Sequence, residues 1–208
     1  FLDDGNDSIN LLFQKALTYC KINKTISNYN FLQNKTDNKF SYNIKIKNYI
    51  HIHLDEKWFN ELYIKKYTDI KLTYDNFIIF LNNLSKEKNI LITSGIKDFL
   101  LLETLKNKFL NKQSEKIFFK KSNNNLIYYI HKPTFDDLES LLKNSFFLIS
   151  CHGAITHAAN SFNVKIIDII EKNKNSFYER FTSYLKNYYP IYRSDFETLQ
   201  KNILNIIN

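Results

Sequence analysis

The stretch SCHGAITHAANSFNVKIIDII, residues 150–170, contains two of the five histidines and one of the three glycines of this 208-residue chain. The apolar residues before it predict a buried strand, AITHAANSF predicts a helix, and VKIIDII predicts another strand. A glycine between a strand and a helix lets backbone N–H groups approach a ligand without an intervening side chain, and a helix N-terminus favours an anion. The pattern therefore predicts a phosphate-binding loop around Gly153.

His51 and His53 suggest a different chemistry, because an H-x-H at the end of a first strand begins the metal site of amidohydrolases. His131, His152 or His157 would then supply further ligands. That fold needs eight strand–helix units over about 250 residues, whereas this chain has five predicted strands. Alternation within IHIHL instead places His51 and His53 on one face of a strand, where packing under a helix explains them. We favour packing, and elemental analysis for bound metal would distinguish the two.

Strand and helix patterns alternate along most of the chain. Strands are predicted at 48–54, 89–93, 125–130, 146–150 and 164–170, and helices at 74–87, 97–109, 134–143, 154–162 and 194–207. Such alternation predicts an α/β fold, a Rossmann-like open parallel sheet with helices on both faces. Ligands of these folds bind at the carboxyl ends of the strands. The loops HLDEKWF, TSGIKD and SCHGAITH are therefore the segments in which we expect a site.

The domain organisation follows from the same patterns. Residues 8–20 have apolar residues at helical spacing, and the polar segment that follows has the composition of a linker. We interpret 1–47 as an N-terminal helix and polar linker, the remnant of a missing N-terminal domain, since the chain does not begin with methionine. Residues 48–208 are predicted to form the Rossmann-like domain with its C-terminal helices.

Composition narrows the classes of function. The formal charge of +8 is spread along the chain rather than clustered, which argues against a nucleic-acid partner. The two cysteines are far apart and belong to no C-x-x-C pair, which favours a reducing cytoplasm over a zinc or disulfide scaffold. No apolar run reaches the roughly 18 residues of a membrane span, and the first residues lack the pattern of a signal peptide.

The run from Lys132 to Ile170 resembles the nucleotide-binding half of the heptosyltransferase-like glycosyltransferases of family 9, which have the GT-B fold of two Rossmann-like domains. That family has K-P-[ST]-L-x-x-L before a helix and a strand, followed by D-T-G-x-x-H-L-A-A. The loop HLDEKWF also resembles the first-strand loop of the family, and the resemblance covers about residues 48–170. The resemblance is carried by Lys132, Pro133, Thr134, Leu138, Gly153, His157, Ala158 and Ala159, with His157 one position later than the histidine of the family pattern.

The resemblance implies a metal-independent glycosyltransferase that moves a sugar from a nucleotide-diphosphate sugar to a surface glycan or its lipid-linked precursor, as in lipopolysaccharide biosynthesis. It implies no cofactor, a cytoplasmic location, peripheral association with the inner face of the membrane, and a catalytic base on the missing N-terminal domain. The N–H groups of Gly153, Ala154 and Ile155 and the ammonium of Lys57 would hold the diphosphate. Substrate contacts are also expected at Asp98, Cys151, His152 and His157.

The chain departs from the family pattern at several of these positions. Cys151 and His152 replace the usual Asp and Thr, and Lys57 directly precedes Trp58, where one residue commonly intervenes. Val164 and Lys165 replace a strand start that usually carries proline. We expect the backbone of the loop to be kept despite these changes. The side-chain contacts to the sugar are not carried over from the family, so the resemblance does not identify the donor.

Plainer interpretations remain open beside the resemblance. Gly153 could serve only a tight turn, Lys57 could be a solvated loop lysine, His157 a core histidine, and Asp98 a helix cap. The aromatic and basic segment 177–193 is interpreted as a packing face, with Arg180 and Arg193 as candidate phosphate or acceptor contacts. The alternative functions are a related GT-B nucleotide-sugar epimerase and a non-catalytic basic module that binds nucleic acid or a partner.

Overall fold

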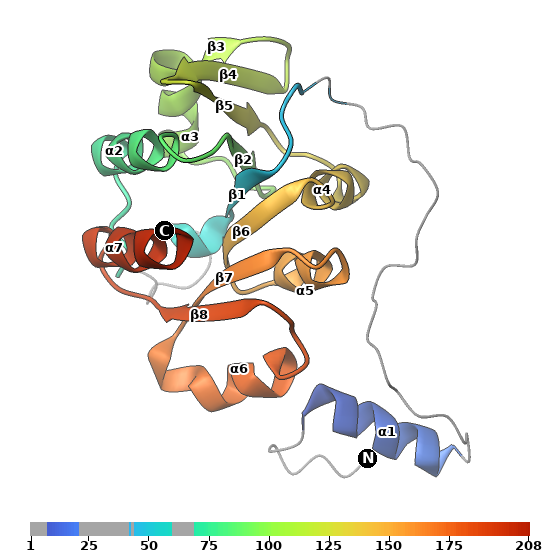
Figure 1. Cartoon of the computed structure of the whole chain (residues 1–208). Coiled ribbons are helices and arrows are strands. Elements are labelled where there is room, and N and C mark those ends of the chain that lie inside the picture. Colours follow the sequence, from blue (N-terminus) through green and yellow to red (C-terminus); the bar gives the residue numbers. More distant parts are fainter. Residues whose placement is uncertain (1–7, 21–41, 43, 60–68) are drawn as a thin grey trace.

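The described part of the computed structural model comprises residues 8–20, 42, 44–59 and 69–208. One mixed, mostly parallel sheet organises it, in the order β3-β4-β5-β2-β1-β6-β7-β8 (Figure 1). The bounds are β1 Tyr49–Leu54, β2 Ile90–Ser94, β3 Asn111–Lys112, β4 Ile117–Ser122, β5 Asn125–Ile130, β6 Ser145–Cys151, β7 Lys165–Ile170 and β8 Tyr188–Tyr192. The predicted α/β class with an open Rossmann-like sheet is confirmed.

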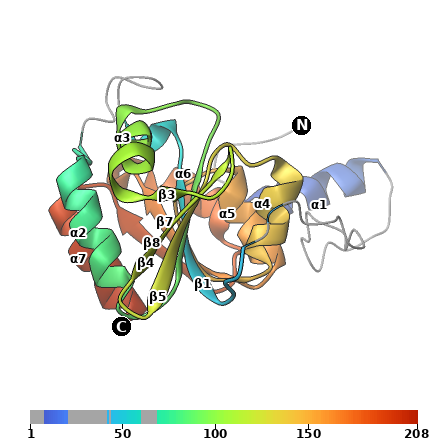
Figure 2. The same cartoon turned by 90° about the horizontal axis from the view of Figure 1, so that it is seen from above.

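The helices lie on both faces of this sheet (Figure 2). One face carries α2 (Tyr74–Leu84), α3 (Leu100–Thr104), which continues as a π-helical turn over Leu105–Phe109, and α7 (Phe196–Ile207). The other face carries α4 (Phe135–Leu142) and α5 (Ala154–Ser161), while α6 (Asn175–Thr182) leads into the edge strand β8. Short 3₁₀ turns follow β1 (Glu56–Trp58) and β7 (Lys172–Lys174), and α1 spans Ile9–Tyr19.

Local sequence explains where these helices begin. Thr73 caps α2, where its hydroxyl accepts the N–H of Asn76 and the Asn76 side chain accepts the N–H of Thr73. Thr134 and Asp137 form the same reciprocal box at the start of α4. Such caps satisfy amides that lack a partner within the helix, so they fix the first turn of each helix where the sequence predicts it.

The strand order places a reversal at the centre of the sheet. The six parallel strands lie in the order β5-β2-β1-β6-β7-β8, so the chain runs outward from β1 to β5 and then from β6 to β8. This is the strand order of the Rossmann fold, in which ligands bind between the two strands where the order reverses. Here these strands are β1 and β6.

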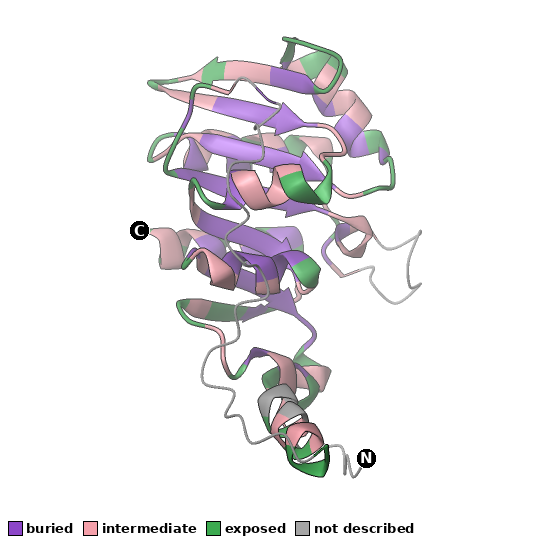
Figure 3. Ribbon diagram, turned by 90° about the vertical axis from the view of Figure 1, so that its right-hand side faces the viewer, coloured by how far each residue is buried: buried purple, intermediate pink, exposed green. Residues whose placement is uncertain are grey.

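The core fills both sides of the sheet (Figure 3). Ile50, Ile52 and Leu54 of β1 pack with α2, α3 and α7 in the largest apolar cluster. Two smaller clusters cover the opposite face, one around Tyr49 and Tyr128 and the other between α5 and strands β6 and β7. Because the strands are buried on both faces, apolar runs such as NILIT predict them well.

The sequence analysis missed three strands, so its count of five was wrong. Strands β3 and β4 form an antiparallel extension beside β5, in a segment whose lysines and asparagines hide the strand pattern. Strand β8 lies within 177–193, the segment that we had interpreted only as a packing face, and its Pro190 fits an edge strand. The first predicted helix is confirmed as α1, and the linker interpretation falls mostly outside the described residues.

His51 and His53 point to the same face of β1, as the alternation predicts. Both rings hydrogen-bond the hydroxyl of Thr93 on β2, at 2.8 Å from His51 Nε2 and 2.9 Å from His53 Nδ1. Both residues are buried, and burial holds the pKa of His51 well below its usual range and lowers the pKa of His53 to about 4. The pair is therefore neutral and packed around Thr93.

Burial of these neutral histidines should make the fold sensitive to acid. Between pH 6.5 and pH 4 the unfolded chain binds more protons at His53 than the folded chain does, so the free energy of unfolding should fall as the pH is lowered. The shift corresponds to roughly 3 kcal/mol. Urea unfolding of the parent and of His53→Gln at pH 7 and pH 4.5 measures this, and the variant should lose less stability on acidification. Equal losses in both chains would contradict the assignment.

Candidate functional site

The loop after β1 is fixed by its own side chains. Asp55 Oδ1 accepts the backbone N–H of Lys57 at 3.0 Å, which closes the short turn. The Trp58 side chain is 1% exposed, and its indole N–H donates to the carbonyl of His53 at 2.9 Å. With Trp58 anchored in the core, the neighbouring Lys57 side chain is directed along the ends of the strands.

Lys57 reaches the loop after β6, as the phosphate-site hypothesis requires. Its ammonium donates to the carbonyl of His152 and lies 3.6 Å from Asp55 Oδ2. A Cβ atom built on Gly153 would lie 3.0 Å from Lys57 Nζ. The loops HLDEKWF and SCHGAITH therefore meet at the β1/β6 reversal, and we call this place the crevice.

Space, not backbone conformation, explains the glycine at position 153. Its φ of −178° is extended backbone that any residue adopts. Among the described residues, four of the six non-glycine residues with a left-handed conformation are asparagines, at Asn48, Asn123, Asn163 and Asn187. Position 153 is therefore a glycine because any side chain there would come too close to the Lys57 ammonium.

The first turn of α5 adds backbone donors to the crevice. Thr156 N–H donates to the carbonyl of Gly153 at 3.0 Å, and the Thr156 hydroxyl accepts the N–H of Gly153 at 3.3 Å. The intervening N–H groups of Ala154 and Ile155 belong to the first helical turn, where amides have no partner within the helix. The expected backbone donors of Ala154 and Ile155 therefore lie beside Lys57.

A row of buried polar residues runs beneath the crevice, and the sequence analysis missed it. Thr93, His53, Ser150 and Asp168 are register neighbours on β2, β1, β6 and β7, and all four are buried. We call them the polar row. Besides His53, the sequence signal for it is a lone aspartate inside the apolar strand KIIDII, at a position where an unpaired charge would be costly.

Asp168, which is 0% exposed, accepts hydrogen bonds from three different elements. Its Oδ2 lies 2.6 Å from His152 Nδ1 and 2.9 Å from the hydroxyl of Tyr188, and its Oδ1 accepts the Thr156 hydroxyl at 3.3 Å. The predicted site residue His152 is therefore held from below by a buried carboxylate. Its ring also packs edge-on against the rings of His157 and Tyr178.

His157 has the contacts of a packed histidine. Its Nδ1 lies 2.7 Å from the Tyr184 hydroxyl, and the two rings stack. Burial lowers the pKa of His157 to about 4, so the ring is neutral near pH 7. The plainer interpretation of this residue, a satisfied core histidine, fits the structure.

Cys151 faces the opposite side of the sheet from Asp168. Its side chain is 1% exposed within the largest apolar cluster, and burial raises the pKa of the thiol well above its usual range. The expected substrate contact at Cys151 would therefore have to come from its backbone. The thiol itself accepts a hydrogen bond from Arg193 at 3.4 Å.

Arg193, directly after β8, contacts Lys57 and Asp69, which both lie between β1 and α2. Its side chain is 4% exposed, its Nη2 donates to the carbonyl of Lys57 at 2.8 Å, and the guanidinium pairs with Asp69 at 2.9 Å. These contacts hold the loop after β1 from behind. The guanidinium, which we had considered as a phosphate or acceptor contact, is thus used to position Lys57.

Asp98 lies at the same edge but beside β2 and β5. It pairs with Lys132 and lies 3.6 Å from His131 Nε2, and Lys132 lowers the pKa of the Asp98 carboxyl. The N-cap of α3 is Phe99, without a side-chain cap, so the capping interpretation of Asp98 is wrong. No contact among the described residues joins Asp98 to Lys57 or Gly153, and its expected contact with ribose stays a prediction.

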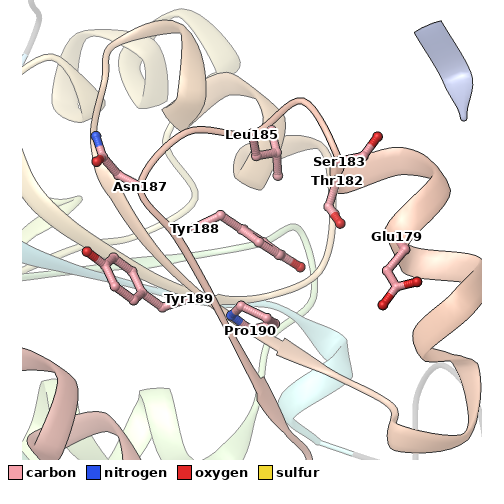
Figure 4. Close-up of a pocket in the computed structure, with 8 residues that line it drawn as sticks. All are labelled: Glu179, Thr182, Ser183, Leu185, Asn187, Tyr188, Tyr189 and Pro190. Atoms are coloured by element: carbon pink, nitrogen blue, oxygen red, sulfur yellow. The ribbon is translucent and has the colours of Figure 1, made fainter.

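A separate hollow of about 570 Å³ lies between α6 and the edge strand β8 (Figure 4). The Tyr188 ring points from the strand toward Thr182 and Glu179, whereas the Tyr189 ring points away from them. It is open to solvent, and Glu179 is the one charged residue among the eight that line it. Its relevance to the crevice is indirect, because the Tyr188 ring lines the hollow while its hydroxyl reaches Asp168.

Three further findings bear on the function. Among the described residues, no three His, Cys, Asp or Glu side chains gather as metal ligands would. None of the helices in the described ranges has the length and apolar character needed to cross a bilayer. No protein-family model matches the chain, and no curated protein matches it closely enough to indicate a relative.

The contacts of Arg193 predict a marked effect of its removal. Arg193→Gln should lower the free energy of unfolding by about 2 kcal/mol, because buried hydrogen bonds to charged groups are lost at Asp69 and at the carbonyl of Lys57. Urea unfolding measures the loss. The matched control is Lys201→Gln, which removes an exposed α7 pair with Glu197 and should cost less than about 0.5 kcal/mol. Similar losses in the two variants would contradict the positioning role.

Proposed function

We propose that this chain is the donor-binding domain of a family 9-like glycosyltransferase, in which a nucleotide-diphosphate sugar binds at the crevice. The observation that supports this most is the meeting of Lys57 with the Gly153 loop at the point where the strand order reverses. Two segments almost a hundred residues apart, each expected from the sequence to bind phosphate, border the same place. A Rossmann-like sheet binds ligands at this reversal.

The proposed role of the crevice in transfer is to stabilise the leaving group. When the bond between the sugar and the diphosphate breaks, negative charge develops on the phosphate oxygens. The N–H groups of Ala154 and Ile155 and the Lys57 ammonium would stabilise that charge at fixed positions. The acceptor, a surface glycan or its lipid-linked precursor, and the base that activates it are expected on an N-terminal domain.

Lys57 must exchange partners to act in this way. In the structure its ammonium is satisfied by the carbonyl of His152 and lies beside Asp55. Burial raises the pKa of the Asp55 carboxyl to about 6, since desolvation outweighs the nearby ammonium. A diphosphate at the crevice would replace these oxygens as the partner of Lys57 and would favour the protonated form of Asp55.

Gly153→Val tests the close approach at the loop. The extended backbone at this position accepts valine, so the fold should remain, but the added carbons would displace the Lys57 ammonium and cover the amides. We expect binding of ADP, UDP and GDP to be lost in calorimetric titrations while far-UV circular dichroism stays that of the parent. Equal affinities in parent and variant would exclude Gly153 from a diphosphate site.

Lys57→Ala tests the charge at the crevice. A hydrogen bond to a charged group contributes roughly 1.5–3 kcal/mol, so affinity for the best-binding nucleoside diphosphate should fall about ten- to a hundredfold. The bare nucleoside should bind almost unchanged, which separates this effect from general unfolding. Lys97→Ala, at an exposed lysine in the loop after β2, is the matched control and should bind like the parent. A parent that binds none of the three diphosphates would refute the proposed function.

A further inference from the structure

The carboxylate of Asp168 is fully buried, so it needs hydrogen-bond donors around it. Two of its three hydrogen-bond partners are the hydroxyls of Tyr188 and Thr156, which carry no charge. The third partner is the His152 ring, at 2.6 Å. Within the described residues, His152 is thus the only group in contact with Asp168 that can take a positive charge.

The second ring nitrogen of His152 faces outward. Nδ1 is directed to Asp168, and no described residue hydrogen-bonds Nε2. In the described part of the chain, Ser161 Oγ is the single buried side-chain polar atom without a partner, so Nε2 reaches solvent, and the side chain is 15% exposed. A carboxylate that holds one imidazole nitrogen fixes the orientation and tautomer of the ring and leaves the other nitrogen for a ligand.

Several elements surround this ring. Asp168 approaches from β7, and behind it lies Tyr188 of β8. Neutral His157 of α5 and Tyr178 of α6 pack against the ring, and Tyr178 donates to Glu171 Oε2. Lys174 is paired with Glu171 at 2.6 Å. From the loop after β1, Lys57 donates to the carbonyl of His152 itself, so the ring lies next to the crevice.

Charge at the crevice is poorly matched to a diphosphate. Lys57 is accompanied by Asp55, and Glu56 extends from the same loop, where its Oε2 would lie 3.7 Å from a Cβ on Gly95. Arg193 is paired with Asp69, and Asp168 adds a further negative charge below. One ammonium therefore faces several carboxylates, and a diphosphate needs more positive charge than Lys57 supplies.

We propose that His152, positioned by Asp168, takes up a proton from solvent when a diphosphate binds and so becomes the second cation of the site. This inference rests on the proposed function, because it concerns how the same crevice binds its phosphate ligand. Nε2 receives the proton, and Nδ1–H remains on the Asp168 carboxylate. His152 is then a binding residue and Asp168 a positioning residue.

Proton uptake measured by calorimetry tests the inference directly. The probe is whichever of ADP, UDP or GDP binds best, titrated at pH 7 in two buffers with different ionisation enthalpies. The parent should take up more protons per ligand than His152→Gln, and its affinity should rise more steeply as the pH is lowered from 7.5 to 6. A full proton corresponds to at most about tenfold in affinity per pH unit. His131→Gln, at a histidine of the same edge that pairs with Asp98, should behave like the parent.

Asp55 can also take up a proton when the ligand binds, so its contribution to the measured proton uptake must be separated from that of His152. With Asp55→Asn as the reference chain, adding His152→Gln should still lower the number of protons taken up. Asp168→Asn should lower uptake as His152→Gln does, whereas a merely structural Asp168 would change only the unfolding temperature. In the parent, ¹⁵N NMR of the histidines should show His152 with its proton on Nδ1.

The outcomes separate the two proposals. Diphosphate binding with the same proton uptake in the parent and His152→Gln would overturn the role of His152 and leave the proposed function standing. Unchanged uptake in Asp168→Asn would overturn the positioning role of Asp168. No binding of any nucleoside diphosphate to the parent would overturn both proposals. His152→Gln changes a side chain that reaches solvent, so this variant should fold. Its proton uptake tests the role of His152 even if Asp168→Asn does not fold.

Discussion

Everything at the candidate site depends on the reversal of strand order between β1 and β6. Crossovers between parallel strands are right-handed, so a chain that changes direction at this point must place the next helices on the opposite face. The chain therefore leaves β1 toward α2 on one face and β6 toward α5 on the other. The two loops diverge above neighbouring strands. Lys57 spans the gap between them, and the absence of a side chain at Gly153 gives its ammonium room.

The polar side chains buried in the sheet all have hydrogen-bond partners on neighbouring strands or helices. A buried polar group without such a partner would destabilise the fold. The hydroxyl of Thr93 hydrogen-bonds both His51 and His53, and Asp168 is hydrogen-bonded by residues of the loop after β6, of α5 and of β8. The polar row thus links the floor of the crevice to the helices that cover it. On the opposite face, Arg193 connects the end of β8 to the loop after β1 by a hydrogen bond to the carbonyl of Lys57.

The charges of the crevice restrict what it can bind. Lys57 and the first-turn amides favour an anion, whereas Asp55, Glu56 and Asp168 oppose a highly charged one. A site with this balance becomes more favourable to phosphate as protons are added. Burial raises the pKa of Asp55 to about 6, and in the proposal above a second proton would bind Nε2 of His152, which reaches solvent. Proton binding would then be part of the recognition of the ligand rather than a background effect of pH.

The sequence by itself determined the central strands, the helices that cover them and the two loops at the reversal. Runs such as NILIT and FFLIS are short and rich in β-branched or aromatic residues, which favours buried strands, and Thr73 and Thr134 mark the starts of helices. It did not determine β3, β4 or β8, because these strands at or next to the edges of the sheet alternate less clearly and contain lysine, tyrosine or proline. Tertiary structure alone decided that Asp168 would hold His152, that Cys151 would face the core, and that Arg193 would position Lys57. Those outcomes depend on which strands become neighbours and which face each residue takes. Local sequence does not encode either, because both follow from the packing of distant segments.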